Sequence, residues 1–411
     1  MRVSSLIRVS ALLIAIPLCL AAVGLNAQAQ DVGADVGGGA GIFRPKNPEV
    51  KKRGPRPTST VRRTNTTRTA PVTTAVTDDR VDELLVQGNQ MRDARRFAEA
   101  ENSYQSVLKL KPRDGRAAYG LGNIYADQQR WDEAETAYRN AVLWSPTEVE
   151  ALVALSVVLV QPRAGAGNAK RFADSESFAR RAIQLQPNNA VAWDRLGVAL
   201  QSRGVFNDET EHAYRRAVEI DPQFAVAYAH LARVLRRIGR REEAAPLYDR
   251  AIQLAKDPPT LNLIAESLQA EQQWANSEPV LKRVLEIDPR EPTAVLLLGR
   301  MLVVFKRYQE AEPYLKTATE VSPRGFQPFN LLGRTYLALD RFEEAEVTYE
   351  RAAQFASAGD RKQLAGVFGF EGVGDGYLKA KKKPSAARAY RRALDLDPGN
   401  KELTQKLSKA S

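Results

Sequence analysis

The sequence predicts an all-α protein, an α-solenoid built from about nine helix-turn-helix units stacked side by side. Similar phrases, such as "VEIDPQF" at 218–224, "LEIDPRE" at 285–291 and "LDLDPGN" at 394–400, close one helical pattern and open the next. Between them, apolar residues return at the three- and four-residue spacing of a helical face. Proline ends a helix at the same place in most units and divides the chain into units of about 34 residues. The marking prolines are Pro112, Pro146, Pro187, Pro222, Pro289, Pro323 and Pro398.

Each unit also carries a small residue at a fixed point of its first helix and a large residue on its second helix. Two antiparallel helices that pack closely need a small side chain where their backbones cross, and a ring or leucine fills the neighbouring gap. The small residues are Gly88, Gly122, Gly197, Ala232, Ala265, Gly299, Gly333 and Gly374. The large residues, sixteen positions later in most units, are Tyr104, Tyr138, Tyr248, Leu281, Leu315, Tyr349 and Tyr390.

This pattern resembles the tetratricopeptide repeat, and the resemblance covers everything from residue 81 to residue 400. It implies a right-handed superhelix in which no unit is stable alone, because only stacking buries the apolar face of each unit. We place the nine units at 81–114, 115–148, 149–189, 190–224, 225–257, 258–291, 292–325, 326–366 and 367–400. The polar stretch 401–411 is expected to form a short C-terminal capping helix.

Two units depart from the regular length. The third carries an insertion at 161–168, "QPRAGAGN", and the junction of the eighth and ninth carries extra residues near 357–366. Such insertions could contact a partner, but loops also tolerate added residues at little free-energy cost. Both alternatives remain open from the sequence.

The first 29 residues are expected to be a secretory signal peptide. An uncharged run, Ala11–Leu25, follows two arginines and is too short to span a bilayer, and Ala27 and Ala29 form a small-residue cleavage site. The expected location is therefore periplasmic or extracellular, with an uncleaved membrane anchor as the alternative. After cleavage no cysteine would remain, so stability would have to come from packing rather than from disulfides.

Residues 30–80 are expected to form a disordered linker rich in glycine, proline, threonine and basic residues. They contain too few apolar side chains to offset the entropy of ordering. Within residues 44–68, nine Lys and Arg side chains face a single acid, Glu49. This stretch has a local charge of +8, while the whole chain has a net charge of +11. An alternative function follows, in which the basic stretch binds an acidic envelope polymer or nucleic acid.

The sequence offers no catalytic site, metal site or cofactor site. The two histidines, His212 and His230, have no cysteine or histidine partner at ligand spacing, so both are interpreted as ordinary helix residues. No set of nucleophile, base and orienting group can be assembled. We therefore expect a protein that is not an enzyme and that has no small-molecule substrate.

The resemblance implies a concave groove, lined by the first helices, that binds an extended or helical peptide of another protein. Asparagine suits such a groove because its amide both donates to and accepts from a peptide backbone, and arginine pairs with carboxylates. The lysines of the family's clamp for chaperone tails are absent, and Leu85, Tyr119 and Asp194 stand in their places. The groove candidates are Asn89, Arg92, Arg116, Asn123, Arg233, Arg236, Arg237, Asn262, Glu266, Gln269, Arg300, Asn330 and Arg334.

The arginines at 233, 236 and 237 lie on one helical face, because they are three and four residues apart. Clustered like charges gain little for folding, so an acidic peptide across units five to eight is the expected ligand, with Asn262 and Asn330 holding its backbone. The sequence thus favours a non-enzymatic scaffold of the extracytoplasmic compartment. Its partners would be other proteins, while nucleic acid and lasting membrane contact are not expected.

Overall fold

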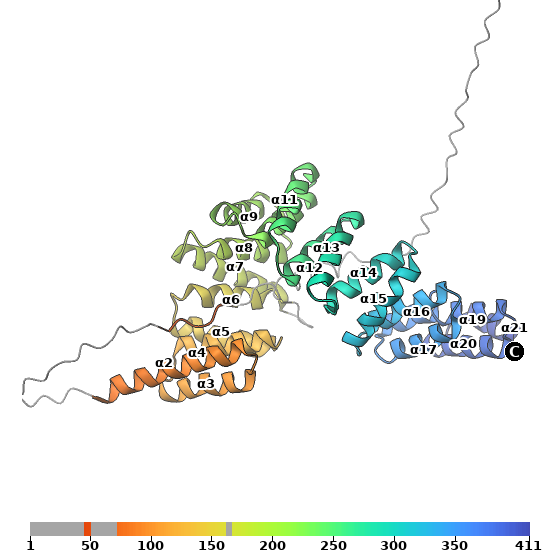
Figure 1. Ribbon diagram of the computed structural model, residues 1–411, viewed down its shortest axis with the longest axis horizontal. Helices are drawn as coiled ribbons and strands as arrows, with labels where there is room; N and C mark the ends of the chain where they lie inside the picture. The colour runs from red at the N-terminus through yellow and green to blue at the C-terminus, as the bar shows by residue number, and fades with distance from the viewer. Residues whose placement is uncertain (1–44, 51–71, 162–166) are drawn as a thin grey trace, which may run out of the picture.

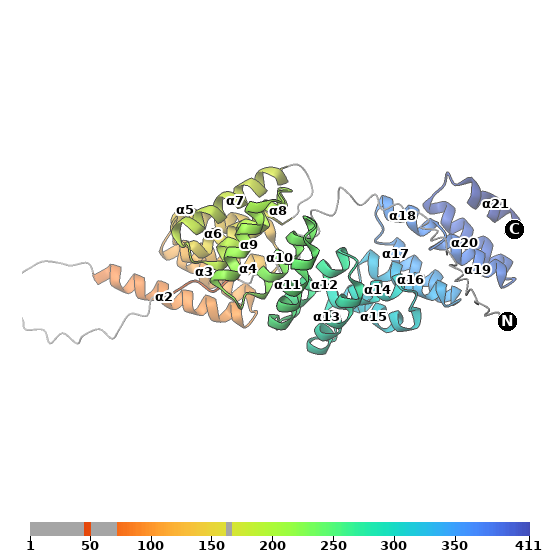
Figure 2. The same cartoon turned by 90° about the horizontal axis from the view of Figure 1, so that it is seen from above.

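The computed structural model describes residues 45–50, 72–161 and 167–411, with side chains described in the first helix from Asp78 onward. This part of the chain is helical and contains no strand, and its helices pack pairwise along a curved array (Figures 1 and 2). The expected all-α solenoid is confirmed. No described helix combines the length and apolar character needed to cross a membrane.

Nine units each contribute a pair of helices, with α18 inserted between the eighth and ninth pairs and α21 following the last. The bounds are α2 Val72–Asp93, α3 Phe97–Leu110, α4 Gly115–Asp127, α5 Trp131–Trp144, α6 Val149–Leu159, α7 Asn168–Leu185, α8 Ala190–Ser202, α9 Asp208–Ile220, α10 Ala225–Arg237, α11 Arg241–Leu254, α12 Pro258–Ala270, α13 Trp274–Ile287, α14 Pro292–Val304, α15 Tyr308–Val321, α16 Phe326–Ala338, α17 Phe342–Ala353, α18 Ala358–Ala365, α19 Phe370–Lys379, α20 Lys383–Leu396 and α21 Lys401–Ala410.

The crossing of the two helices in a unit is as close as the small residues predict. A Cβ atom added to Gly122 would lie 2.5 Å from the ring of Tyr138, and one added to Gly333 would lie 2.5 Å from the ring of Tyr349. Both rings have no exposed surface. Because carbon atoms pack at about 3.5–4.0 Å, glycine is required where the backbone approaches a ring this closely.

The turn between the two helices of a unit uses a residue in the left-handed region at a fixed position. Seven residues after the small residue, φ is 57° at Arg95, 58° at Gln129 and 59° at Lys306, while glycine occupies the same place at Gly204 and Gly239 with φ of 78° and 92°. The position recurs in units that otherwise differ in sequence. Its conformation therefore belongs to the turn rather than to one residue type.

An arginine-to-glutamate ladder links neighbouring units. The arginine eight residues after the small residue pairs with a glutamate 29 residues earlier, in the preceding unit: Arg240 with Glu211 at 2.6 Å, Arg307 with Glu278 at 2.8 Å and Arg341 with Glu312 at 2.8 Å. Each of these arginines also pairs with a glutamate three residues later in its own helix. The pairs are partly exposed, so each contributes about 0.2–1 kcal/mol.

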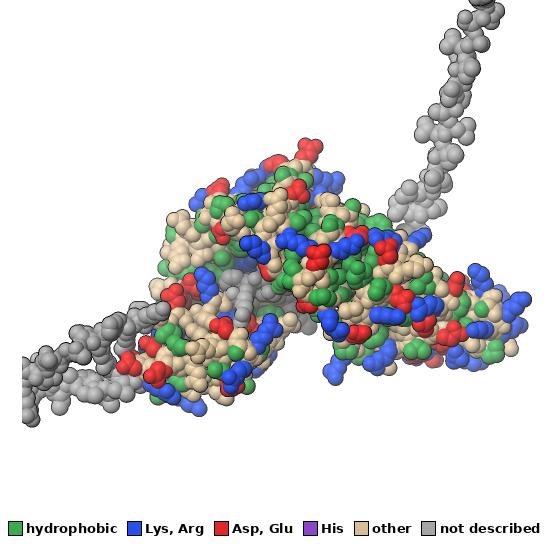
Figure 3. All heavy atoms as spheres, viewed as in Figure 1, with side chains coloured by type: hydrophobic (Ala, Val, Ile, Leu, Met, Phe, Trp, Pro, Cys, Tyr) green, Lys and Arg blue, Asp and Glu red, His purple; other side chains and the backbone are tan. Residues whose placement is uncertain are grey.

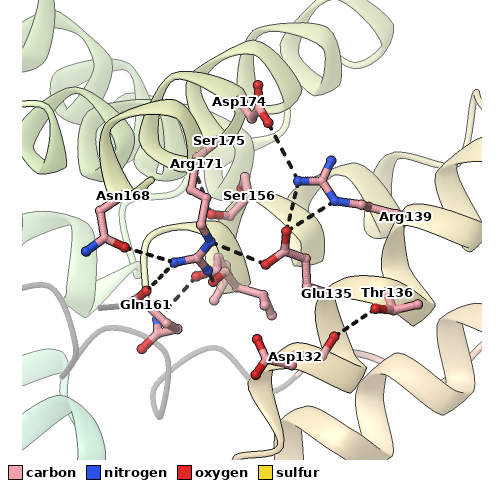
Figure 4. A network of polar contacts seen from close by, with 12 residues as sticks. Asp132, Glu135, Thr136, Arg139, Ser156, Gln161, Asn168, Arg171, Asp174 and Ser175 are labelled. Carbon is pink, nitrogen blue, oxygen red and sulfur yellow. Dashed lines mark hydrogen bonds and ion pairs between the residues drawn. The ribbon is translucent and has the colours of Figure 1, made fainter. Parts of the chain in front are cut away.

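The irregular third unit is closed by Arg171 at the start of α7 (Figure 4). Its guanidinium donates to the backbone oxygens of Val158 and Gln161 at 2.9 and 2.8 Å, which are carbonyls at the C-terminal end of α6. It also lies 3.3 Å from Glu135 on α5. The guanidinium donates to carbonyls that have no partner within the helix. Its positive charge is also stabilised by the negative C-terminal end of the helix dipole. Within the predicted insertion at 161–168, residues 162–166 lie outside the described residues.

The second insertion forms α18, which begins with a capping box between Ser357 and Asp360. Its residues Leu364 and Ala365 are buried. Lys401–Ala410 forms α21 at the position expected for a capping helix, and its Leu403 is fully buried.

The linker prediction needs a correction at two places. Helix α2 begins at Val72, nine residues before the expected start of the first unit. Residues 45–50 are also ordered, and Val50 packs against the core of the first unit. The signal peptide, and the rest of the basic stretch from 51 to 68, lie outside the described residues.

Candidate peptide-binding groove

The groove of the first two units presents two asparagine amides at equivalent positions, one residue after the small glycine. The hydroxyl of Tyr104 donates to Oδ1 of Asn89 at 2.7 Å, and the hydroxyl of Tyr138 donates to Oδ1 of Asn123 at 2.8 Å. Burial raises the pKa of both tyrosines, so the hydroxyls stay protonated. Since each amide oxygen is engaged, each Nδ2 group is left to donate to a ligand.

The chain itself supplies such a ligand in residues 45–50, "PKNPEV" (Figure 1). Nδ2 of Asn123 donates to the carbonyl oxygen of Lys46 at 3.0 Å, and Nδ2 of Asn89 donates to the carbonyl oxygen of Pro48 at 3.0 Å. The two amides lie one repeat apart, and they hold carbonyls two residues apart. The repeat period of the array therefore matches the spacing of a bound peptide backbone.

Arg92 completes the contact with this segment. Its Nε and Nη2 atoms donate to Asp127 on α4 at 2.8 and 3.1 Å, which fixes the guanidinium plane. Nη1 donates to the carbonyl oxygen of Pro45 at 2.8 Å and to Oδ1 of Asn47 at 3.0 Å. The Arg92 side chain is only 1% exposed. Pro45 and Pro48 are buried as well.

One edge of this part of the groove is acidic. Burial, the carboxyl of Glu150 and the charge of Glu49 together raise the pKa of Glu148 to about 7. Glu148 and Glu150 lie at the start of α6, and Glu49 belongs to the bound segment. Although it is partly desolvated, Glu148 keeps an accessible surface, so water screens these repulsions.

The structure places Arg116 differently from the other three candidates of the early units. Its guanidinium pairs with Asp82 on α2 and with Asp114, the N-cap residue of α4, both at 2.9 Å. Within the described part of the chain, none of its hydrogen bonds reaches residues 45–50. Three of the four early candidates, Asn89, Arg92 and Asn123, are therefore brought together on one ligand.

The arginines of unit five line a hollow of about 470 Å³ between α10 and α12. Arg233 donates to Oε1 of Gln201 at 2.7 Å, Arg237 lies 4.3 Å from the ring centroid of Phe206, and Arg236 pairs with Glu271. Each of these arginines therefore has a contact within the fold, which the sequence analysis did not anticipate. Arg241 adds a further positive charge to the same hollow, so its lining remains positive overall.

The candidates in units six to eight are mostly tied to neighbouring helices. Arg300 donates to Oε1 of Gln269 at 2.8 Å, and Arg334 lies 5.0 Å from the ring centroid of Phe368. Glu266 is half-buried on α12. Two amide oxygens in this region are buried and accept no hydrogen bond within the described residues, those of Asn262 and Asn330.

A hollow of about 350 Å³ near the C-terminal units has a mixed lining. Its charged side chains are Arg334, Asp340, Asp375 and Lys379, and its larger apolar side chains include Val303, Leu337, Phe342, Val367 and Phe368. The last two side chains are more than half exposed. Figure 3 shows acidic and basic side chains interspersed on the face in view, rather than a single field of one sign.

A buried polar cluster was missed by sequence reasoning. Nδ1 of His230 donates to the carboxylate of Asp194 at 2.7 Å, and Arg195 pairs with the same carboxylate. Burial lowers the pKa of His230, and the charge of Asp194 opposes this shift. Burial alone would raise the pKa of Asp194. The neighbouring Arg195 and His230 outweigh this effect, and the pKa of Asp194 is lowered overall. The sequence shows the position of Asp194 within its repeat. Its partner His230 lies 36 residues away, so no local sequence pattern indicates the pair.

No cluster of His, Cys, Asp and Glu side chains with the arrangement of a metal site occurs among the described residues. The polar groups that converge in the groove are hydrogen-bond donors to a backbone and arginines. Such an arrangement is suited to hydrogen bonding with the backbone of a peptide.

Two tetratricopeptide-repeat family models match the chain, one over residues 85–147, 262–324 and 306–361 and the other over 227–261. No curated protein matches the chain significantly.

Similar solved structures include MamA, with 25% identity, 41% of this chain and 93% of that chain covered, and a TM-score of 0.36. Another is TTC0263, described as a thermophilic TPR protein of Thermus thermophilus, with 21% identity, 46% and 99% coverage and a TM-score of 0.39. A third is YrrB, described as a TPR protein with an unusual peptide-binding site, with 22% identity, 49% and 97% coverage and a TM-score of 0.37. The family-model matches show that this chain carries tetratricopeptide repeats.

Proposed function

We propose that the protein is a non-enzymatic scaffold that holds partner proteins by binding their peptide segments in the concave groove of its repeats. Tetratricopeptide repeats indicate a role in protein–protein interaction. The observation that carries the peptide-groove proposal is the seating of residues 45–50, whose backbone carbonyls accept hydrogen bonds from Asn89, Arg92 and Asn123. Side chains that donate hydrogen bonds to backbone carbonyls can bind a peptide from another chain equally well, because every peptide carries these carbonyls.

A double variant, Asn89→Asp with Asn123→Asp, tests this proposal. Each aspartate still accepts the tyrosine hydroxyl, but it replaces the Nδ2 donor by an oxygen that repels a peptide carbonyl. Proteins captured from a cell-envelope extract by the intact chain should therefore be lost from the double variant. Asn102→Asp, at an exposed site on α3, is the control for the added charge. Equal capture by the double variant and the control would contradict binding in this part of the groove.

Acidic partner segments are a further part of the proposal, located at the hollow of unit five. Four arginines and one glutamate line it, so a carboxylate-bearing peptide meets a net positive surface. Replacing Arg233, Arg237 and Arg334 by alanine should weaken partner capture tenfold or more, which corresponds to about 1.4 kcal/mol. The melting temperature should fall only slightly, because the contacts of Arg237 and Arg334 with aromatic rings contribute about 0.5–1 kcal/mol each. If the triple variant binds the same partners with unchanged affinity, the three arginines are not part of the binding site.

We further propose that the scaffold works outside the cytoplasm, on the basis of the sequence of residues 1–29. Fractionation of cells should place the protein in the envelope or the medium. N-terminal sequencing of the mature chain should begin near residue 30. Recovery of the protein from the cytoplasm, with its first 29 residues still attached, would refute this location.

A further inference from the structure

We infer that residues 45–50 are an internal ligand that closes the groove of the first two units, and that a partner enters this groove by displacing them with a proline-containing segment of the same kind. The inference rests on the proposed function, because it concerns the same groove. It adds the class of the partner segment and a means of regulating access.

The segment occupies the donors of Asn89, Arg92 and Asn123 that face it in the described part of the groove. The two asparagine amides and Nη1 of Arg92 donate to the carbonyls of residues 45, 46 and 48. Asn47 is held on both sides, since its Oδ1 accepts from Arg92 and its Nδ2 donates to Asp93 at 2.9 Å. A second peptide cannot use these donors until the segment leaves.

Most of these contacts could be made by another peptide. The three carbonyl contacts involve groups that every peptide carries. The residue-specific features are the packing of Val50 against the core of the first unit, the two buried prolines and the amide of Asn47, the last three in the order Pro-x-Asn-Pro. Proline fixes φ near −65° and so lowers the entropy lost when a segment is immobilised. A competing partner is therefore expected to carry prolines three residues apart.

The covalent connection gives the internal segment a large advantage over a free peptide. The 21 residues from 51 to 71 join the segment covalently to α2. A covalent connection of this length gives an effective concentration on the order of 1 mM. If the isolated segment binds with a Kd on the order of 10 µM, the ratio of occupied to free groove is about 100:1. A partner of equal intrinsic affinity then binds about 100-fold more weakly than it would bind a free groove.

One feature of the segment weakens its own binding and keeps it displaceable. Glu49 carries the same charge as Glu148 and Glu150 at the start of α6, and it makes the smallest of the contributions that raise the pKa of Glu148. A partner with a neutral or basic residue at the position of Glu49 would avoid this repulsion. The groove thus favours a partner of the form Pro-x-Asn-Pro followed by a residue that is not acidic.

Fluorescence anisotropy with a labelled synthetic peptide of residues 43–52, "FRPKNPEVKK", tests the inference. The full chain is compared with an open variant in which residues 45–50 are replaced by six Gly and Ser residues. The open variant should bind the peptide at least tenfold more tightly than the unaltered chain. Equal affinity of the two proteins, or absence of binding to the open variant, would overturn the inference.

Two controls link the binding to the groove. Asn123→Asp in the open variant should weaken peptide binding at least tenfold, while Asn102→Asp should leave it unchanged. A peptide with lysine at the position of Glu49 should bind the open variant more tightly than the natural sequence. If Asn123→Asp has no effect, the segment binds elsewhere and the inference fails.

The segment could instead occupy the groove of a second copy, which light scattering across a concentration series would detect. A dimer that forms with the unaltered chain and not with the open variant would overturn closure within one chain. These results are separable from the proposed function. Capture of partners that depends on Asn89 and Asn123, together with equal peptide affinity of the unaltered and open chains, would leave the scaffold role intact.

Discussion

Substituting Gly197 in the fourth unit tests the close crossing on which the array depends. A Cβ atom at this position would lie 2.5, 2.6 and 2.8 Å from Cζ, Cε1 and Cε2 of Tyr214. Carbon atoms pack at about 3.5–4.0 Å, so the ring or the helix has to move by about 1 Å. The ring cannot easily turn away, because Tyr214 is fully buried and its hydroxyl donates to Gln201 at 3.0 Å.

The size of the effect should depend on the size of the new side chain. Ala232 occupies the equivalent position in unit five, opposite Tyr248, so a unit can be built around one methyl group. Gly197→Ala is therefore expected to destabilise the protein by about 1 kcal/mol, and Gly197→Leu by about 3 kcal/mol, at the upper end of the usual range for overpacking. At about 2–4 °C per kcal/mol, the leucine variant should melt roughly 6–12 °C lower than the unaltered protein.

Thermal unfolding followed by far-ultraviolet circular dichroism measures this difference. Gly359→Ala is the matched control, because the nearest atom to an added Cβ is Oγ of Ser357 at 3.9 Å. Its melting temperature should stay close to that of the unaltered chain, with a free-energy change within about 0.5 kcal/mol. If Gly197→Leu melts at the same temperature as the control, the assignment of Gly197 to the helix crossing is wrong.

Three further outcomes are expected. Arg171→Ala should destabilise the third unit by about 1–3 kcal/mol, because carbonyls at the end of α6 lose their donor; equal melting temperatures would contradict this role. Binding of the labelled peptide to the open variant should weaken as the pH rises from about 6 to about 8, because Glu49 of the peptide favours the protonated form of Glu148 in the complex; Glu148→Gln should flatten this profile. Since the folded state lowers the pKa of His230, stability should fall as the pH drops below about 6.5, and His230→Gln should reduce that loss.

The features predicted correctly from the sequence are those that repeat within one unit. The pairing of Gly122 with Tyr138 is local and periodic, so the same spacing could be read several times along the chain. The pairing in the inter-unit ladder could not be predicted in the same way. Arg307 has Glu310 three residues away and Glu278 one unit away, and the sequence alone does not show that it contacts both.

The site was predicted in part, for physical reasons that differ between residues. Asn89 and Asn123 follow from the repeat, because their position relative to the small residue places them in the groove. Arg116 pairs with Asp114 two residues earlier and with Asp82, and these partners were not anticipated from the sequence. The docking of residues 45–50 could not be predicted from composition, which indicates disorder. It depends on a few hydrogen bonds between segments 41 to 77 residues apart.

The ladder between units has a consequence for how this protein could have arisen and could change in length. Each arginine meets a glutamate at one fixed offset in the unit before it, so a unit that carries both groups fits before or behind any other unit of its kind. Duplication of a segment such as 292–325 would supply both halves of a new junction in a single genetic event. The array can therefore gain or lose whole modules without new interface mutations, whereas an insertion within a unit, as in the third, needs its own arginine to close it.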